Sequence, residues 1–363
     1  MAIPIQNHSQ LIASKVVGAF SEDIPVRAGF SDAFPRETTP TLHVDVEVER
    51  DNDLISVDVM RFTEGNKNKR TKVSQSKYEP PFHNEQYDFA RDEIYMNTVA
   101  LAGVTSSVNV NAAIAQNALK AVRNNRKKVE RAIMKQQADV LQTGIVTVIN
   151  GDNIDYRRKA TSIVDLGASK YWSVAASDPI ADFINGMKFL RNVGNSGGTI
   201  VNAFMRESAL NALLNNANAA LAKALDSRRM DRANITMPQF NEISGMGFHG
   251  QIAAGDFSIN LWTYNEKYTN ASGVTKYYLE EYNVIMLPSD FRGKTIFGGL
   301  PYMRQTSVGG QSIKVPGVME ADYLIRGWDD EKTISSTLEL TSAPLVVPFT
   351  IDKIYTMKVL ASS

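Results

Sequence analysis

Residues 245–250 read Gly-Met-Gly-Phe-His-Gly, which matches the G-x-G-x-x-G pattern of dinucleotide-binding loops. That chemistry needs a strand before the glycines and a helix after them, because the helix N-terminus holds the pyrophosphate. The residues that follow, 251–264, have a β-like pattern instead. We therefore predict a tight turn between two strands at 245–250 and no cofactor site. A soluble α/β enzyme that binds a nucleotide stays open as an alternative.

Other residues for catalysis or metal binding are sparse and far apart. The chain has no cysteine, which excludes thiol chemistry, disulfides and cysteine-ligated zinc. Its histidines are His8, His43, His83 and His249, and no two have a spacing that places both on one face of a helix or strand. The acidic run at 329–331 lacks the ligand count and turn glycine of a calcium loop. We therefore predict no catalytic residue and no metal, which argues against an enzyme.

Composition limits the partners and the size of the core. Lysine plus arginine and aspartate plus glutamate both total 39, so only local patches can attract a charged partner. The apolar runs fall far short of the roughly 20 residues that cross a bilayer, and the first residues lack the pattern of a secretory signal. We predict no membrane partner. A length of 363 residues predicts two or three sub-domains.

One long helix carries most of the local positive charge. Apolar residues at helical spacing predict a helix over 111–141, a rod of roughly 45 Å, with Gly144 placed to end it. Its basic residues are Lys120, Arg123, Arg126, Lys127, Lys128, Arg131 and Lys135. The single acid among them is Glu130. Two interpretations stay open, a solvated face paired with acids elsewhere or a face turned toward an anionic polymer or partner.

A two-stranded arm precedes this helix. Strict alternation of apolar and polar residues over 41–49 predicts a half-buried strand. The polar run at 64–69 predicts an exposed tip, and the chain returns through 70–78 to Pro80 and Pro81. A two-stranded hairpin is marginal in water unless it lies on another surface. The arm therefore predicts a partner surface, such as a neighbouring copy of the chain.

The second half of the chain has the pattern of a compact α/β sub-domain over 179–330. Asp178 followed by Pro179 predicts the start of a helix. A buried segment at 199–204 and a helix at 207–225 follow, and helix, strand and helix in this order indicate an α/β layer.

β-like segments continue to the end of the chain. Those at 257–264, 276–282 and 284–287 extend the α/β sub-domain. The segments at 333–340 and 353–360 are expected to return the chain to the sub-domain that holds the long helix.

Several short strings, in the same order along nearly the whole chain, resemble one family. They are 34–37 (Phe-Pro-Arg-Glu), the helix end at 137–144, 155–158 (Asp-Tyr-Arg-Arg), 225–229 (Leu-Asp-Ser-Arg-Arg), the glycines at 245–250, the strand-turn-strand at 270–279 and 342–345 (Ser-Ala-Pro-Leu). With the arm, the long helix and the closing β segment, they resemble the major capsid (head) protein of lambda-type tailed bacteriophages. That family adopts the Hong Kong 97-type capsid fold.

The resemblance implies an α+β fold with a set division of the chain. Residues 1–35 would form an N-terminal arm and 36–90 an extended hairpin loop across a neighbouring subunit. A peripheral domain over 91–178 would hold the spine helix, 179–330 would form the axial domain, and 331–363 would return to the peripheral domain.

The resemblance also implies a structural protein of the virion capsid. It would assemble in the bacterial host cytoplasm as hexamers and pentamers of an icosahedral shell around double-stranded DNA. The partners implied are further copies of the chain, a scaffolding protein, the portal and a decoration protein. A compartment shell of the encapsulin type, with the same fold and an enzyme cargo, stays open as a second alternative.

Two surfaces gain a role from the resemblance. The basic face of the long helix would line the shell interior and contact DNA or a scaffold. The basic residues of the hairpin tip would contact acidic groups of adjacent subunits, and they are Lys67, Lys69, Arg70, Lys72 and Lys77.

Overall fold

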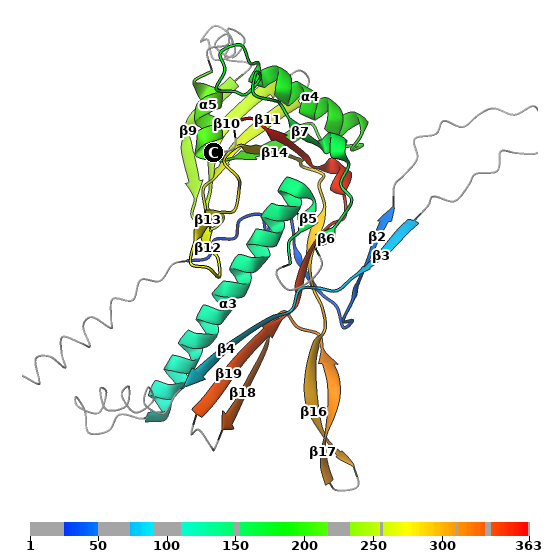
Figure 1. Ribbon diagram of the computed structural model, residues 1–363, viewed down its shortest axis with the longest axis vertical. Coiled ribbons are helices and arrows are strands. Elements are labelled where there is room, and N and C mark those ends of the chain that lie inside the picture. The colour runs from blue at the N-terminus through cyan, green and yellow to red at the C-terminus, as the bar shows by residue number, and fades with distance from the viewer. Residues whose placement is uncertain are drawn as a thin grey trace, which may run out of the picture. The chain divides into compact units, whose positions relative to one another are not determined.

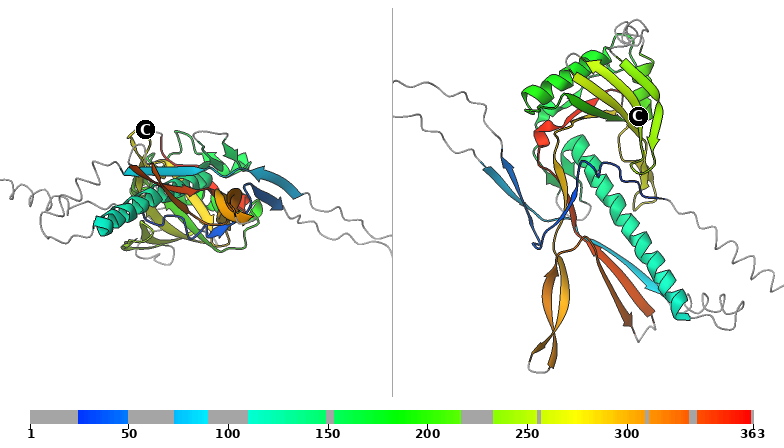
Figure 2. Two further views of the ribbon diagram at one scale, coloured as in Figure 1. Left: turned by 90° about the horizontal axis from the view of Figure 1, so that it is seen from below. Right: turned by 180° about the vertical axis from the view of Figure 1, so that it is seen from behind.

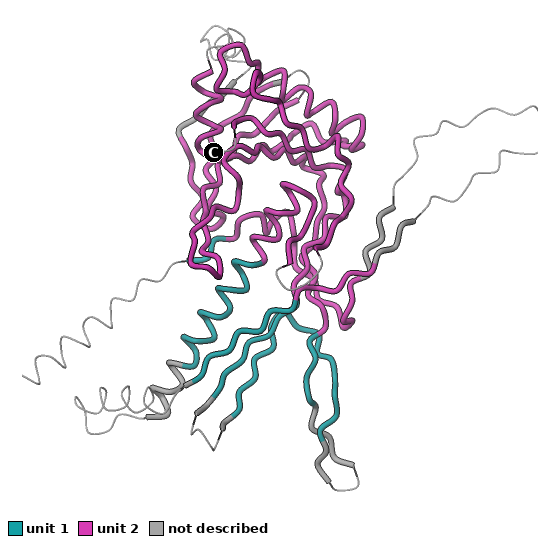
Figure 3. The backbone as a smooth tube through the Cα atoms, viewed as in Figure 1, with its two compact units in different colours: residues 1–27, 82–132, 300–343 teal, residues 28–81, 133–299, 344–363 magenta. Residues whose placement is uncertain are grey.

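The computed structural model describes residues 25–49, 73–89, 110–148, 153–216, 233–254, 257–308, 311–330 and 335–361 (Figure 1). The chain forms two compact units, coloured separately in Figure 3. Unit 1 comprises 1–27, 82–132 and 300–343, and unit 2 comprises 28–81, 133–299 and 344–363. The long helix, α3 (Val110–Thr143), passes from unit 1 into unit 2. No helix of the described residues is long and apolar enough to span a membrane.

A seven-stranded mixed sheet is the centre of unit 2. Its strands, in spatial order, are β7 (Ile163–Asp165), β21 (Tyr355–Lys358), β14 (Asn283–Pro288), β8 (Ile200–Met205), β11 (Phe257–Tyr264), β10 (Met246–Ala254) and β9 (Ala233–Asn241). β8 runs parallel to β11 and antiparallel to β14. The closing strand β21 pairs with β14, so the end of the chain contributes to the same sheet as β8.

Two helices, α4 (Pro179–Asn192) and α5 (Glu207–Leu214), pack on this sheet (Figure 1). The predicted cap of α4 is confirmed, because the carboxylate of Asp178 accepts from the backbone N–H groups of Ile180 and Ala181, both at 3.2 Å. Phe183 and Met187 of α4 are fully buried against sheet residues such as Met286. The last part of the helix predicted at 207–225 lies outside the described residues.

The other strands of unit 2 form several smaller sheets. The strands β1 (Arg36–Thr38), β15 (Gly293–Phe297) and β20 (Pro344–Pro348) form a three-stranded sheet. Short antiparallel pairs join β5 (Ile145–Val146) to β6 (Ile154–Asp155), β12 (Lys267–Thr269) to β13 (Thr275–Tyr277), and β2 (Val44–Glu49) to β3 (Val73–Tyr78). The buried side chain of Gln136 joins α3 to β20, donating to the carbonyl of Pro344 and accepting from the N–H of Val346, both at 3.3 Å.

Unit 1 holds two further β structures. β18 (Leu324–Asp330), β19 (Ser335–Ser342) and β4 (His83–Phe89) form a three-stranded antiparallel sheet. Its centre is the buried carboxylate of Glu339, which accepts from Arg326 (Nε at 2.9 Å) and from Asn84 (2.5 Å). β16 (Leu300–Val308) and β17 (Gln311–Met319) form a separate two-stranded ribbon, visible in both views of Figure 2.

The glycine segment 245–250 differs from the predicted turn. The turn ends at Gly245, whose φ of 74° suits glycine, and strand β10 already begins at Met246. Gly247 faces Thr263 of β11 so closely that a Cβ would lie 2.7 Å from the Thr263 hydroxyl. These glycines therefore serve strand packing, and no helix follows them to hold a pyrophosphate.

Candidate assembly surfaces

The first candidate surface is the basic face of α3. At 3.6 residues per turn, Lys120, Arg123, Lys127 and Arg131 fall within an arc of roughly 80°. The opposite side of the helix is buried and carries Ala121, Asn125 and Val129. Between Lys120 and Arg131 the helix is therefore amphipathic, with the basic arc opposite its buried side.

Within the described residues, Arg126, Lys128 and Lys135 form ion pairs in the subunit. Arg126 lies 3.6 Å from Glu130 and 5.1 Å from the centre of the Tyr323 ring. Lys128 pairs with Glu85 of β4 at 2.7 Å. Exposed pairs of this kind contribute little to stability, typically about 0–1 kcal/mol.

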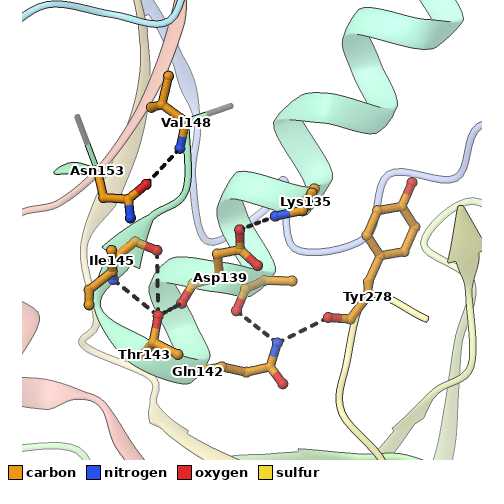
Figure 4. A network of polar contacts seen from close by, with 9 residues as sticks. Lys135, Asp139, Gln142, Thr143, Ile145, Val148, Asn153 and Tyr278 are labelled. Carbon is orange, nitrogen blue, oxygen red and sulfur yellow. Dashed lines mark hydrogen bonds and ion pairs between the residues drawn. The ribbon is translucent and has the colours of Figure 1, made fainter. Parts of the chain in front are cut away.

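The third pair, Lys135 with Asp139, lies near the end of α3 (Figure 4). Burial raises the pKa of Asp139, and the neighbouring Lys135 opposes that rise. This pair belongs to the packed end of the helix, where the surrounding residues are buried. Lys135 is thus set apart from the exposed basic arc.

Three basic residues of the arc have no acidic partner among the described residues. They are Lys120, Arg123 and Arg131. Lys120 and Arg123 are exposed, and Arg131 is half-buried. This part of the helix therefore presents uncompensated positive charge, which attracts an anionic surface without sequence preference.

The second candidate surface is the arm formed by β2 and β3. Its six cross-strand pairs run from Val44 opposite Tyr78 to Glu49 opposite Val73, which confirms the predicted pairing of two strands. Lys77, opposite Asp45, is exposed. The four other predicted tip residues, Lys67, Lys69, Arg70 and Lys72, lie outside the described residues.

Aromatic residues anchor the base of this arm. The Tyr78 ring packs edge-on against Tyr156, with 5.4 Å between centroids, and the Tyr78 hydroxyl donates to the carbonyl of Asp155 at 3.4 Å. The Tyr156 hydroxyl in turn donates to the carbonyl of Val346 in β20 at 2.7 Å. Burial raises the pKa of Tyr156, so this hydroxyl stays neutral and keeps its proton to donate. The arm is thus attached firmly at its root.

Polar contacts fix the C-terminal end of α3 in unit 2. Figure 4 shows Gln142 donating to the carbonyls of Ala138 (3.2 Å) and Tyr278 (3.0 Å). Thr143 accepts from the N–H of Ile145 at 3.2 Å, which joins the helix to β5. The side chains of Gln142 and Thr143 thus join the last turn of α3 to neighbouring segments of unit 2.

Arg158 completes this end of the helix and was not singled out by the sequence. Its guanidinium donates to the carbonyls of Leu141 (2.9 Å) and Gln142 (3.2 Å) at the end of α3. It also donates to the carbonyl of Ile354 (3.0 Å) and the hydroxyl of Thr356 (2.9 Å) beside β21. One side chain thus ties the helix to the closing strand.

Comparisons with known proteins agree with this architecture. The family model described as "Phage major capsid protein E" matches residues 24–359. The solved structure of a protein assigned as the capsid protein of a prophage in E. coli CFT073 is similar, with a TM-score of 0.57, 13% identity, and coverage of 99% of this chain and 100% of that chain.

Two other solved structures overlap with a lower TM-score. One is the Cyanophage A-1(L) capsid, with a TM-score of 0.48, 11% identity, and coverage of 94% of this chain and 95% of that chain. The other is the SrpI encapsulin of Synechococcus elongatus PCC 7942, with a TM-score of 0.42, 9% identity, and coverage of 100% and 98%. No curated protein matches this chain in sequence.

The likeness to the prophage protein shows the fold, so the predicted α+β fold of the Hong Kong 97 type is confirmed. The matched region runs through both compact units and includes α3, the arm and the closing strand. The chain belongs to the phage major capsid protein E family and is a structural protein of a phage capsid shell.

Proposed function

We propose that this chain builds the icosahedral head shell of a tailed phage, as hexamers and pentamers that enclose double-stranded DNA. The observation that carries the proposal is the family match over residues 24–359. A shell of one protein must place the same chain in both six-fold and five-fold surroundings. Rigid cores with movable arms meet this need, and the buried seven-stranded sheet and the two-stranded arm fit those two roles.

The regions of the chain take the following parts in this proposal. Residues 1–35 form an arm, 36–90 an extended loop over a neighbouring subunit, and 91–178 a peripheral domain around α3. The axial domain spans 179–330, and residues 331–363 return to the peripheral domain. The two compact units divide the chain differently, because 300–343 group with 82–132, and β21 belongs to the seven-stranded sheet of unit 2.

The basic arc of α3 faces the shell interior in this proposal. It contacts either packaged DNA or a scaffolding protein that is present before DNA enters. The uncompensated charges of Lys120, Arg123 and Arg131 support this role. The further partners are the portal and a decoration protein, and assembly takes place in the bacterial host cytoplasm.

Electron microscopy of the expressed chain, with and without a co-expressed scaffold, tests the proposal. Shells, tubes or rings of five and six subunits are expected, and closed particles from infected cells should contain DNA that resists nuclease. A uniform small oligomer under every condition would contradict shell assembly. Closed shells that hold a protein cargo and no DNA would contradict the head-shell proposal and support a compartment of the encapsulin type.

A further inference from the structure

The ribbon of β16 and β17 in unit 1 carries several exposed apolar residues, among them Met303 and Val318. Its nine cross-strand pairs run from Leu300 opposite Met319 to Val308 opposite Gln311. Within the described residues, neither strand pairs with any other strand. An isolated two-stranded hairpin is at best marginally stable in water, so this one needs a surface to lie against.

One face of the ribbon is apolar and exposed. The pairs Pro301 opposite Val318 and Met303 opposite Pro316 lie side by side on the same face, because side chains alternate along a strand. We call these four residues the proline face. Met303 is 58% exposed and Val318 44% exposed, and both prolines are exposed. Exposed apolar residues that adjoin one another mark an interaction site more often than scattered ones do.

The opposite face of the ribbon partly covers itself. The Tyr302 ring lies across the strand on Gly317, where an added Cβ would come within 3.1 Å of the ring. Covering a glycine with a cross-strand aromatic ring stabilises a sheet without outside help. Val315 on this face is 39% exposed, so it offers a matched control for the proline face.

The prolines also show how a partner can bind. Proline has no N–H, so the pairs that contain Pro301 and Pro316 are of the kind whose backbone groups point outward from the ribbon. Each open edge therefore lacks one donor at its proline. Such edges resist the addition of another strand. Recognition must then use the side chains of the proline face rather than backbone pairing.

The area of the proline face indicates which kind of partner binds there. A stable complex of two free proteins buries about 800 Å² per partner, and four side chains supply only part of that. A contact this small is stable when many further contacts hold the same two subunits together. A closed shell of identical subunits provides such contacts. The described charge on the same face is Lys314, opposite Gln305, so the centre of the face suits an apolar partner.

We propose that the proline face packs against an apolar surface of a second copy of this chain in the assembled shell. This inference rests on the shell assembly given above. The contact would cover the exposed side chains of Met303 and Val318, and it would couple the folding of the ribbon to assembly.

Thiol labelling tests this contact with little disturbance of the fold. Because the chain has no cysteine, Met303→Cys and Val315→Cys each introduce a single thiol on opposite faces. The maleimide labelling rate is measured in free subunits and in shells that contain no other protein. We expect Met303→Cys to label at least tenfold more slowly in shells, and Val315→Cys to change less than threefold.

Equal labelling of Met303→Cys in subunits and shells would overturn the proposal, and so would equal protection of both thiols. Failure of the unmodified chain to form shells would instead count against the proposed function, and it is seen by microscopy before any labelling. A second measurement is independent of thiol access. Lysine at both Met303 and Val318 should lower the yield of shells at least tenfold, whereas Val315→Lys should leave it within a factor of three, and equal yields would again overturn the contact.

Discussion

At the residue scale, a few buried polar side chains determine how the elements are joined. Arg158 is the clearest, because its donors meet the end of α3 and the closing strand at once. The sequence could not reveal this role, since Ile354 and Thr356 lie almost 200 residues further along the chain. Glu339 acts similarly in unit 1, where Arg326 balances its buried charge. Removing Arg158 or Glu339 would therefore remove several hydrogen bonds at once.

Replacement of Arg158 by methionine should destabilise the subunit strongly. The change removes the guanidinium that donates to the carbonyls of Leu141, Gln142 and Ile354, and a loss of roughly 2–4 kcal/mol in the free energy of unfolding is expected. The free energy of unfolding of Arg158→Lys should lie between those of the unchanged chain and Arg158→Met. Urea unfolding of the unassembled subunit measures this, with Arg157→Met, an exposed neighbour, as the control. Equal midpoints for both methionine variants would contradict the role of Arg158.

The environments of two histidines predict that the free energy of unfolding decreases at acidic pH. Burial lowers the pKa of His83 and of His249 below the ordinary value of 6.5, although Glu85 partly opposes this at His83. As the pH falls through 6.5, these histidines bind protons in the unfolded chain before they do so in the folded chain. The free energy of unfolding is therefore highest above pH 6.5 and decreases below it. Unfolding midpoints between pH 7.5 and 5 test this. The decline should be smaller in His83→Gln, and an unchanged slope would rule out the contribution of His83.

At the scale of elements, sequence patterns predicted the helices and strands that bury one face within their own subunit. The helix expected at 111–141 is α3, Val110–Thr143, and the capped start of α4 lies where Asp178 and Pro179 placed it. β16 and β17 were missed because both of their faces carry exposed apolar residues, which removes the alternation that marks a half-buried strand. The basic arc was visible from spacing alone. The ion pair of the neighbouring Lys128 with Glu85 was not visible, because Glu85 is 43 positions away along the chain.

Replacing the glycine in helix α4 by alanine should destabilise the subunit, although alanine normally favours a helix. Gly186 is buried, and a Cβ there would lie 2.5 Å from Met286 Sδ and 2.9 Å from the Tyr355 ring. Gly186→Ala should therefore lower the free energy of unfolding by about 1–3 kcal/mol despite the better helix propensity of alanine. Asn185→Ala, exposed on the same helix, should be neutral or slightly stabilising. A more stable Gly186→Ala would contradict the tight packing.

The basic arc of α3 should act during filling of the shell. Glutamate at Arg123, Lys127 and Arg131 reverses the charge of the basic arc without changing the buried side of the helix, and the yield of DNA-filled particles should fall at least tenfold. The matched control reverses three exposed lysines of unit 2, Lys188, Lys267 and Lys276. Sedimentation of particles from infected cells separates filled from empty shells. A normal yield of filled particles from the arc variant would refute the interior role.

At the scale of the whole molecule, the chain combines a well-packed core with two-stranded ribbons that join no larger sheet among the described strands. The seven-stranded sheet and its helices are buried as in any stable domain. The β2–β3 arm and the β16–β17 ribbon each pair only with themselves among the described strands. Such a division is expected of a subunit that completes its structure by contact with its neighbours, which is the central claim here.

The most direct test is a cryo-EM reconstruction of the assembled particle, in which every subunit is seen with its neighbours. We predict an icosahedral shell in which the β2–β3 arm lies across an adjacent copy. The basic arc of α3 should face the lumen, and the proline face should be covered by another subunit. Arms folded back on their own subunits, or a basic arc on the outer surface, would contradict the account.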